Sequence, residues 1–570
     1  MVARMTQRFG ACVLSAVLVA CSAAPSAAPN PSPGSSAGTP ASANPTAAAC
    51  VPVAVPGADG AADPQPAWAN RTWYEVFVRS FSDSDGDGIG DLAGLTAKLD
   101  YLKDLGIGGL WLMPIAQAAS YHGYDVTDYT KVEPDFGDQA ALKAFVAAAH
   151  ERGILVIVDF VINHTSVDHP WFQDALKGGP HRDWYIWSDT DPGWPPVAGP
   201  NPWHRTEAGD YYYGAFWEGM PDLNLRNPAV SAEIERVAEV WLGEDGVDGF
   251  RIDAARHLIE DDGAHQSNTP ETLAWLANFT ATVHARHPDA LVLGEAYDTS
   301  KSAGAYVPKS LDSTFDFGLA AAMVAAVANR RTPPITTSLA ETIRYWPVNR
   351  EASFLTNHDQ TRVMSQLFGD VPSARLAAFM LLTGPGMPFI YYGEEIGLQG
   401  RKPDEQIRTP MPWTADGPAA GFTTGTPWEP LAEGWPTANV ATEAADPTSL
   451  LGTYKRSIAF RADHPALVAG GTLLVDGGAS TVIGWLRVAK GETLLVVVNV
   501  GTTAVSDYAL ALGGGPLCGI TGASAIGGIG GSSSPAVKTP AINATGGFDA
   551  YQPIGTLQPR SGYVISLTAQ

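Results

Sequence analysis

Eight short apolar runs, separated by amphipathic segments, occupy the chain between residues 73 and 391. The runs are Trp73–Val78, Gly109–Leu112, Leu155–Phe160, Val247–Ile252, Leu291–Gly294, Ser313–Phe317, Ala352–Leu355 and Pro388–Tyr391. Segments with helical spacing of apolar residues, such as Leu142–His150 and Ser231–Leu242, lie between them. Alternating strands and helices indicate a parallel sheet, and eight such units predict an α/β fold closed into a (β/α)8 TIM barrel.

Two stretches depart from this alternation. Residues 164–219, after the third run, are too many for a simple connection and are rich in Trp, Pro and Asp, which predicts a small inserted domain. Beyond about Pro465 the helical pattern stops, and short strands alternate with Gly-rich turns. The expected strands are Thr472–Val475, Val482–Leu486, Thr493–Val500 and Tyr563–Leu567. The barrel is therefore expected at 67–163 and 220–465, and an antiparallel β-sandwich domain at 466–570.

The first 20 residues have the pattern of a secretory signal. A basic start precedes an apolar stretch from about residue 11 to residue 20, which is too short to remain as a membrane span. The stretch ends in Leu18-Val19-Ala20-Cys21 and resembles the bacterial lipobox, whose cysteine is acylated. The resemblance implies an exported lipoprotein anchored to a membrane through Cys21, and a signal peptide without lipid is the alternative. Residues 21–66 are rich in Ala, Pro and Ser and predict a flexible linker.

Charge and cysteine content narrow the partners. Acidic residues outnumber basic ones 59 to 35, giving a formal charge of −24, which disfavours nucleic acid as a ligand. A neutral sugar is compatible with this charge, and the 16 Trp and 18 Tyr residues provide rings that could stack on sugar faces. Cys50 and Cys518 would remain after export, either bridged or as two free thiols, because their spacing does not decide the pairing. We expect a monomer.

Polar residues follow several of the expected strands, where barrel enzymes carry their chemistry. Asp253 ends the fourth strand and Glu295 the fifth, so their carboxyl groups could lie ~5 Å apart, the spacing of retaining glycosidases. Arg251 precedes Asp253 by two residues on the same strand face and would keep it ionised. Glu295 would need a raised pKa to act as an acid, and burial together with the carboxylate of Asp359 would raise it.

These segments resemble the signature regions of the α-amylase superfamily, glycoside hydrolase family 13, from about Trp73 to Leu467. The matching motifs are DFVINH (Asp159–His164), GFRIDAARH (Gly249–His257), GEA (Gly294–Ala296), LTNHDQTR (Leu355–Arg362) and GMPFIYYGEEIG (Gly386–Gly397). The resemblance implies that Asp253 is the nucleophile, Glu295 the general acid/base and Asp359 the third, transition-state-stabilising carboxylate.

The resemblance also implies the substrate contacts. Tyr124, His164, Arg251 and His358 would line the subsite of the cleaved glucose, with the two histidines donating hydrogen bonds to sugar hydroxyls. Tyr121 and Arg408 are added as candidate substrate-binding residues.

Two features point to a subfamily. MPDLN (Met220–Asn224) resembles the signature of neopullulanase-like members and of a group intermediate between them and the oligo-1,6-glucosidases, which contains lipoprotein α-amylases. Exo-acting α-glucosidases usually carry an Asp three residues before the equivalent of Tyr124, and Tyr121 stands there instead. A ring at this position could stack on a further glucose, which favours endo action.

The first strand is followed by a run of alternate carboxylates and glycines, Asp83-Ser84-Asp85-Gly86-Asp87-Gly88-Ile89-Gly90-Asp91. Oxygen-rich loops of this kind suit calcium, and the run resembles the calcium loop of oligo-1,6-glucosidase-like members. The implied ligands of a structural calcium ion are Asp83, Asp85, Asp87, the Ile89 carbonyl and Asp91. A solvated acidic turn without metal is the alternative.

Three functions follow from these patterns. The first is an endo-acting α-amylase that cleaves α-1,4 bonds of starch and maltooligosaccharides. The second is an α-glucosidase, cyclomaltodextrinase or neopullulanase-like, transglycosylating enzyme with the same chemistry. The third is a maltodextrin-binding lipoprotein without catalysis, which the presence of Asp253, Glu295 and Asp359 disfavours.

Overall fold

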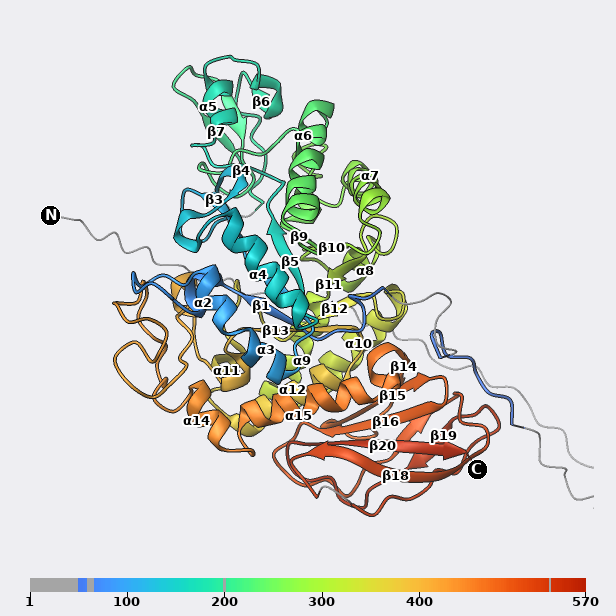
Figure 1. Cartoon of the computed structure of the whole chain (residues 1–570). Helices are drawn as coiled ribbons and strands as arrows, with labels where there is room; N and C mark the ends of the chain where they lie inside the picture. Colours follow the sequence, from blue (N-terminus) through green and yellow to red (C-terminus); the bar gives the residue numbers. More distant parts are fainter. Residues whose placement is uncertain (1–49, 59–65, 198–200, 533–534, 570) are drawn as a thin grey trace, which may run out of the picture. The chain divides into compact units, whose positions relative to one another are not determined.

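A computed structural model describes residues 50–58, 66–197, 201–532 and 535–569. Its centre is a closed barrel of eight parallel strands in the order β1-β13-β12-β11-β10-β9-β5-β2, which confirms the predicted fold class (Figure 1). The barrel strands are β1 (Trp73–Val76), β2 (Gly109–Leu112), β5 (Leu155–Phe160), β9 (Gly249–Ile252), β10 (Leu291–Gly294), β11 (Ser313–Phe315), β12 (Glu351–Ser353) and β13 (Met387–Tyr391). Each corresponds to one of the eight apolar runs, with ends that differ by at most two residues.

Aromatic side chains fill the barrel interior. Trp73, Trp111, Phe315 and Phe389 are all buried there, and the rings of Trp73 and Phe389 stack with centroids 5.5 Å apart. Gly109 pairs with Trp73 in the register of β1 and β2, and a Cβ atom at Gly109 would lie 2.5 Å from the Trp73 ring. A glycine at this position therefore makes room for the largest side chain of the interior.

Helices surround the barrel, apart from short ones in the loops at its mouth. They are α1 (Val78–Phe81), α2 (Leu92–Ala97), α3 (Leu99–Leu105), α4 (Gln139–Glu151), α6 (Pro228–Glu239), α7 (Pro270–Arg286), α8 (Ser300–Gly304), α9 (Phe317–Asn329), α10 (Pro333–Tyr345), α11 (Val363–Gln366), α12 (Val371–Thr383), α13 (Asp404–Ile407), α14 (Val440–Ala445) and α15 (Leu450–Asp463). Short 3-10 turns form η1 (Pro134–Phe136), η4 (Ala255–His257) and η5 (Glu394–Ile396), and a π-helical turn, η3 (Val240–Glu244), continues α6. Side chains of Asp138, Thr269 and Ser449 cap the first turns of α4, α7 and α15, which fixes where these helices begin. No helix among the described residues is long and apolar enough to cross a membrane.

The segment after β5 forms a small layer above the barrel (Figure 1). It contains α5 (Pro170–Leu176), η2 (Arg182–Trp184) and a three-stranded sheet of β6 (Trp187–Ser188), β8 (Tyr211–Tyr213) and β7 (Trp203–Arg205). The connection that follows β2 contains a hairpin of β3 (Ala116–Ala118) and β4 (Val126–Val132). Asp222 of the MPDLN motif is buried and accepts a hydrogen bond from Asn163 Nδ2 at 2.9 Å, which joins this segment to the end of β5.

The C-terminal domain is a five-stranded antiparallel sheet packed with a strand pair. The sheet order is β14 (Gly471–Val475), β15 (Val482–Ala489), β16 (Glu492–Asn499), β20 (Ser561–Ala569) and β18 (Ile520–Ile529), and the pair is β17 (Leu510–Leu512) with β19 (Phe548–Tyr551). Three of these strands, β17, β18 and β19, were not predicted, because β18 is built from glycine and small residues and the other two are short. One further short helix, α16 (Pro465–Ala469), follows Pro465, where helices were expected to stop.

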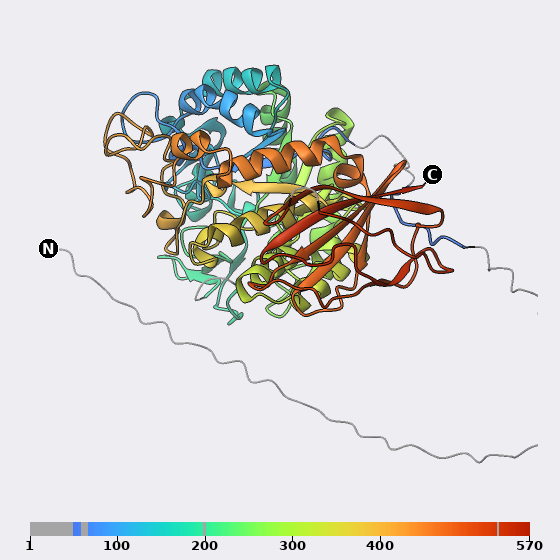
Figure 2. The ribbon, with the colours of Figure 1, turned by 90° about the horizontal axis from the view of Figure 1, so that it is seen from below.

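The C-terminal sheet lies beside the barrel in the view from below (Figure 2), and it contacts the chain just before β13, on the side where that strand begins. The Trp485 indole donates a hydrogen bond to the carbonyl of Thr383, the last residue of α12. On the barrel side, Arg461 of α15 donates to the carbonyl of Gly384, in the connection from α12 to β13. The inserted segment follows the opposite ends of the strands, so the C-terminal domain leaves the mouth of the barrel free.

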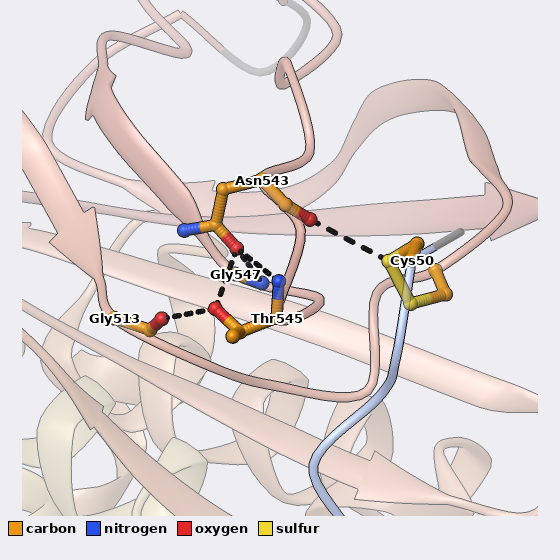
Figure 3. Close-up of a disulfide and its surroundings, with 6 residues drawn as sticks. Cys50, Gly513, Asn543, Thr545 and Gly547 are labelled. Carbon is orange, nitrogen blue, oxygen red and sulfur yellow. Dashed lines mark hydrogen bonds between the residues drawn. A yellow bond between two sulfur atoms is a disulfide. The ribbon is translucent and has the colours of Figure 1, made fainter. Parts of the chain in front are cut away.

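Residues 50–58 were predicted to belong to the flexible linker, but they contact the C-terminal domain. Cys50 forms a disulfide with Cys518, which resolves the open question of their pairing. The backbone N–H of Val51 and Val53 donates to the carbonyls of Ala544 and Gly515 of the C-terminal domain, and Val55 is buried. The side chains of Val51 and Val53 are exposed, so the disulfide, backbone hydrogen bonds and Val55 hold this stretch, and the composition of the linker gave no signal for them. The disulfide lies beside a turn in which Asn543 Oδ1 accepts hydrogen bonds from Thr545 and Gly547 (Figure 3). Residues 21–49, including Cys21, and the signal at 1–20 lie outside the described residues.

Candidate active site

One guanidinium organises the mouth of the barrel. Arg251, at the end of β9, places Nη1 2.7 Å from Asp159 Oδ1 and 2.6 Å from Asp253 Oδ1. Its Nη2 lies 2.8 Å from Glu295 Oε2. Arg251 and the Asp159 side chain are buried, whereas Asp253 and Glu295 keep small exposed fractions of 11% and 17%. The two carboxylates expected to do chemistry therefore share one buried cation and still face the outside.

The backbone after Asp253 also contributes. Ala254 has a left-handed conformation with φ of 48°, which is unfavourable for a residue with a Cβ atom. Its N–H donates to Glu295 Oε2 at 3.2 Å. The strained turn thus directs a backbone donor at the carboxylate of the neighbouring strand.

Burial dominates the titration of this group. It raises the pKa of Glu295 to about 7; Arg251 lowers it, and the nearby carboxylates Asp253 and Asp359 raise it further. Burial also raises the pKa of Asp159 to about 8, against the opposing effect of Arg251. Glu295 can therefore carry a proton near neutral pH, as a general acid requires.

His358 links the seventh strand to the first. Its Nδ1 lies 2.6 Å from Glu75 Oε1, and its Nε2 lies 2.6 Å from the Tyr124 hydroxyl. The Tyr124 hydroxyl donates its hydrogen to Asp159 Oδ2 at 3.1 Å. Burial lowers the pKa of His358 well below its usual range, so the ring is neutral. A continuous set of hydrogen bonds therefore runs from β1 to β5 beneath the mouth.

Asp359 stands at the other side of the mouth, held by Arg408. Arg408 Nη2 lies 3.0 Å from Asp359 Oδ1 and 3.1 Å from Asp404 Oδ2. Burial alone would raise the pKa of Asp359, but the pKa is lowered overall, and the Arg408 and Arg251 guanidinium groups are among the charges that lower it. Asp359 therefore stays ionised while Glu295 is protonated, which separates the two carboxyl groups by charge state.

These groups border a cavity of about 380 Å³, here called the mouth cavity. Its lining includes the expected residues Asp253, Glu295, Asp359, Tyr124, His164 and Arg408. Arg251, His358 and Tyr121 are not among the described residues that line it. Arg251 and His358 lie beneath the carboxylates and position them. Tyr121 packs its ring against Trp428 with centroids 5.3 Å apart.

The two histidines do not offer free donors. His164 Nε2 lies 3.1 Å from the Tyr124 carbonyl, and its Nδ1 lies 3.3 Å from Asn163 Nδ2. His358 is engaged at both nitrogens as described above. Each ring nitrogen has a protein partner in this arrangement, so a direct hydrogen bond from either ring to a sugar hydroxyl, which stays a prediction, would replace or share one of these contacts.

Four polar residues of the site were not predicted as such. Glu75 and Asp159 are buried beneath the mouth, and His122 and Asp404 line the cavity. A carboxylate inside an otherwise apolar strand was the available signal for Glu75 and Asp159, since such a group needs a buried partner. Asp404 had no such signal, because it lies in a polar stretch of sequence far along the chain.

A second cavity, here called the side cavity, adjoins the first at Glu295. It has a volume of about 570 Å³ and shares Phe216, Ala254 and Glu295 with the mouth cavity. The exposed ring of Tyr297 and the Arg256 side chain lie along it. Glu295 thus stands on the boundary between two spaces, as a proton donor to a bond between two sugars would.

The acidic run after β1 forms a compact loop. Carboxylate oxygens of Asp83, Asp85 and Asp91 lie within 4.8 Å of one another, an arrangement that fits a cation. Asp83 accepts backbone hydrogen bonds from Gly86 and Gly88, and Asp87 Oδ1 accepts one from Ile89. The structure therefore brings three of the predicted carboxylates together and turns Asp87 toward its own backbone.

A (β/α)8 barrel whose mouth carries two carboxyl groups, Asp253 and Glu295, on one shared guanidinium has the arrangement of a glycosidase. A family model described as "Alpha amylase, catalytic domain" matches residues 75–470. The chain belongs to this family, the α-amylase family of glycosidases.

Individual relatives agree with this assignment. The chain is 40% identical over 443 residues to "Alpha-amylase 3" of Dictyoglomus thermophilum, covering 76% of this chain and 85% of the relative. It is 32% identical to "Oligo-1,6-glucosidase" of Parageobacillus thermoglucosidasius, covering 76% and 90%. Among solved structures, the α-amylase from H. orenii superposes with a TM-score of 0.74 at 36% identity, covering 87% of this chain and 99% of that one.

Proposed function

We propose that this protein is a retaining, endo-acting α-amylase that hydrolyses α-1,4 bonds of starch and maltooligosaccharides. The observation that carries the proposal is the position of Glu295 between the mouth cavity and the side cavity. A glucan bound through both cavities presents an internal bond to Glu295, with sugars on each side of it. The name of the relative from Dictyoglomus thermophilum supports the same specificity.

The geometry suggests the order of events. Asp253 attacks the anomeric carbon of the glucose in the mouth cavity while Glu295 gives its proton to the leaving oxygen. The bond from carbon to the leaving oxygen breaks, and a covalent glucosyl ester forms on Asp253. The ionised Glu295 then takes a proton from water while the water oxygen bonds to the anomeric carbon and the ester bond to Asp253 breaks. Glu295 is then protonated again, and Asp253 is again a free carboxylate. Asp359, kept ionised beside Arg408, would stabilise the positive charge that develops on the sugar.

The product profile tests endo action. Wild-type enzyme acting on amylose should lower the viscosity before much reducing sugar appears, and maltoheptaose should give maltose and maltotriose among the first products. Glucose as the sole early product from maltoheptaose would contradict the proposal. Pullulan and cyclodextrin as further substrates separate α-amylase from neopullulanase-like activities.

An α-glucosidase is the second candidate, and Asp404 is the observation that favours it. Its carboxylate lines the mouth cavity beside Arg408 and could bind the terminal hydroxyls of a chain end. The name of the oligo-1,6-glucosidase relative agrees with this alternative. Replacing Tyr121 by Asp should add a second carboxylate near this position and shift the products toward glucose, and Tyr121→Asn, an uncharged variant of the same size, is the control.

Calcium in the loop after β1 is part of the proposal. Asp83, Asp85 and Asp91 would supply carboxylate oxygens, with Asp87 and the Ile89 carbonyl completing the predicted set. The ion would fix the loop and take no part in the chemistry, since the retaining reaction needs no metal.

Export and anchoring through Cys21 are proposed as well. The disulfide between Cys50 and Cys518 supports an oxidising compartment, where such bonds persist. Cys21→Ala should move the protein from the membrane fraction to the soluble fraction of cells that express the full chain. Equal membrane retention of the variant and wild type would contradict the lipid anchor.

A further inference from the structure

Three consecutive hydrogen bonds join Glu75 to Asp159 beneath the mouth. Glu75 Oε1 lies 2.6 Å from His358 Nδ1, and His358 Nε2 lies 2.6 Å from the Tyr124 hydroxyl, which in turn lies 3.1 Å from Asp159 Oδ2. Each of these contacts needs one hydrogen, so the series needs three. The neutral His358 ring and the Tyr124 hydroxyl supply one each, and ionised carboxylates supply none. One further proton must therefore be held within the series.

The surroundings of the His358 ring show which nitrogen carries its hydrogen. Nε2 faces the Tyr124 oxygen and also lies 3.3 Å from Asp359 Oδ2. Asp359, whose pKa is lowered, is ionised and can only accept, and the Tyr124 hydroxyl has given its hydrogen to Asp159. Nε2 therefore carries the hydrogen of the neutral ring, and Nδ1 is an acceptor.

Glu75 is then the donor to Nδ1. With no hydrogen on Nδ1, the 2.6 Å contact requires one on Glu75 Oε1. The backbone N–H of His358 donates to the same oxygen at 3.3 Å, and a hydroxyl oxygen can still accept that bond. Glu75 is 2% exposed and forms no ion pair with a Lys or Arg of the described residues. Burial without a contacting cation favours the neutral form of a carboxyl group.

Asp159, at the other end of the series, is the alternative holder of the proton. Its Oδ1 lies 2.7 Å from Arg251 Nη1, and a guanidinium in contact favours the ionised form. Burial raises the pKa of both carboxyl groups, but only Asp159 has this direct contact. We propose that Glu75 is held as a neutral carboxylic acid and is the positioning residue that keeps the Nε2 hydrogen of His358 directed at Tyr124 and Asp359.

The other charged groups around the series agree with a neutral Glu75. Those that act on its members are Arg251, Asp253, Glu295, Asp359, Lys402 and Arg408. A negative charge on Glu75 would add to a site that already holds several carboxyl groups. The neutral acid avoids this repulsion and still fixes the ring, so Asp359 is held by the His358 N–H as well as by Arg408.

The experiment is infrared difference spectroscopy of the wild type and Glu75→Gln. A protonated carboxyl group has a C=O stretch that is separate from carboxylate bands and shifts in D2O. At neutral pH the wild type should show one such band that Glu75→Gln lacks. Glu151→Gln, on an exposed residue at the end of α4, is the matched control and should remove no such band. Absence of a lost band in Glu75→Gln, or its loss in Asp159→Asn instead, would overturn the proposal.

The pH dependence of stability gives an independent measurement. An unfolded glutamate loses its proton above about pH 4.3, whereas folded Glu75 keeps it, because burial raises its pKa. The folded state then binds one more proton than the unfolded state, so this contribution to stability is lost as the pH rises through the folded pKa. Gln has no such proton. The melting temperature of Glu75→Gln relative to the wild type should therefore increase with pH, and a parallel pH dependence of the two proteins would contradict the proposal.

Activity separates positioning from a merely structural role. The Gln amide can donate to Nδ1 as the neutral acid does, whereas Met fills a similar space without a donor. For Glu75→Met, kcat on maltoheptaose should fall on the order of 10²-fold, and Glu75→Gln should stay at least about tenfold more active than Glu75→Met. Equal activities of the two variants would contradict positioning. Only this kinetic measurement rests on the proposed function, which fails separately on the product profile of the wild type; the infrared and melting measurements need no substrate.

Discussion

Arg408 Nη2 lies 3.0 Å from Asp359 Oδ1, a contact between residues that follow two different barrel strands. The same guanidinium donates through Nε to the His358 carbonyl at 3.0 Å, so it holds both the side chain and the backbone of the loop after β12. Asp404 supplies a second carboxylate at 3.1 Å. Arg408 therefore positions Asp359 and also sets its charge state.

Removing this cation should raise the pKa of Asp359, because Arg408 is one of the charges that lower it. In Arg408→Gln we expect the acidic limb of the kcat/KM profile to move to higher pH, since Asp359 must be ionised. The rate at the optimum should fall on the order of 10²-fold, as for loss of one preorganised electrostatic group. Arg344→Gln, on an exposed residue of α10, is the control. An unmoved acidic limb would separate Arg408 from the titration of Asp359.

Asp253→Asn should remove turnover and leave glucan binding intact. The amide keeps the shape of the side chain but is a far poorer nucleophile, so kcat should fall on the order of 10⁴-fold. Binding of maltoheptaose, measured by calorimetry, should stay within a few-fold of the wild-type value. Asp261→Asn, an exposed residue of the same loop, should keep full activity. A near-normal rate in Asp253→Asn would remove Asp253 from the nucleophile role.

Activity should fall as the pH rises through about 7. The pKa of Glu295 is raised to about 7, chiefly by burial, and only the protonated form can give a proton to the leaving oxygen. Above that pH, kcat/KM should decline about tenfold for each pH unit. With an aryl glucoside whose leaving group needs no proton, Glu295→Gln should lose this alkaline limb for formation of the covalent intermediate. Persistence of the limb in that variant would assign it to another group.

Calcium should stabilise the protein if the loop after β1 binds it. A ligand at 100 times its Kd adds about 2.7 kcal/mol to the free energy of unfolding, so a chelator should lower the melting temperature of the wild type. Asp85→Ala combined with Asp87→Ala should melt at a lower temperature and no longer respond to calcium. The single variants separate the two residues, because Asp85 belongs to the converging carboxylates and Asp87 does not. The metal content of the wild type is measured with and without chelator. If the melting temperature is the same in both, the loop after β1 does not bind a stabilising calcium ion.

The disulfide should stabilise the folded chain. Replacing Cys50 and Cys518 by Ser should cost about 2–4 kcal/mol of unfolding free energy, the usual range for a native bridge. Reductant should lower the melting temperature of the wild type to that of the double variant and leave the variant unchanged. Catalysis at a temperature far below melting should be unaffected, because the bridge lies on the C-terminal domain. A loss of activity without a loss of stability would contradict this separation.

The alternation of apolar runs and helical segments was sufficient to predict the barrel. Each strand and helix carries its own local periodicity, and eight βα units have one common closed solution. The placement of Asp253 and Glu295 at the ends of adjacent strands also followed from local order, because β9 and β10 are neighbours in the chain and in the barrel.

Other parts of the site depended on tertiary structure. Glu75 and His358 are 283 residues apart and meet only because barrel closure brings β1 and the end of β12 close to each other. The sequence identified Arg408 as a candidate but could not show that it holds Asp359 and Asp404, since Arg408 lies in a polar loop without periodicity. Tyr121 was expected to contact the substrate, yet its ring packs against Trp428, a residue about 300 positions further along the chain. The pairing of Cys50 with Cys518 depended on residues 50–58 packing against the last domain. Local propensity determines which segments become strands and helices, whereas contacts between distant side chains depend on how the assembled elements fit together.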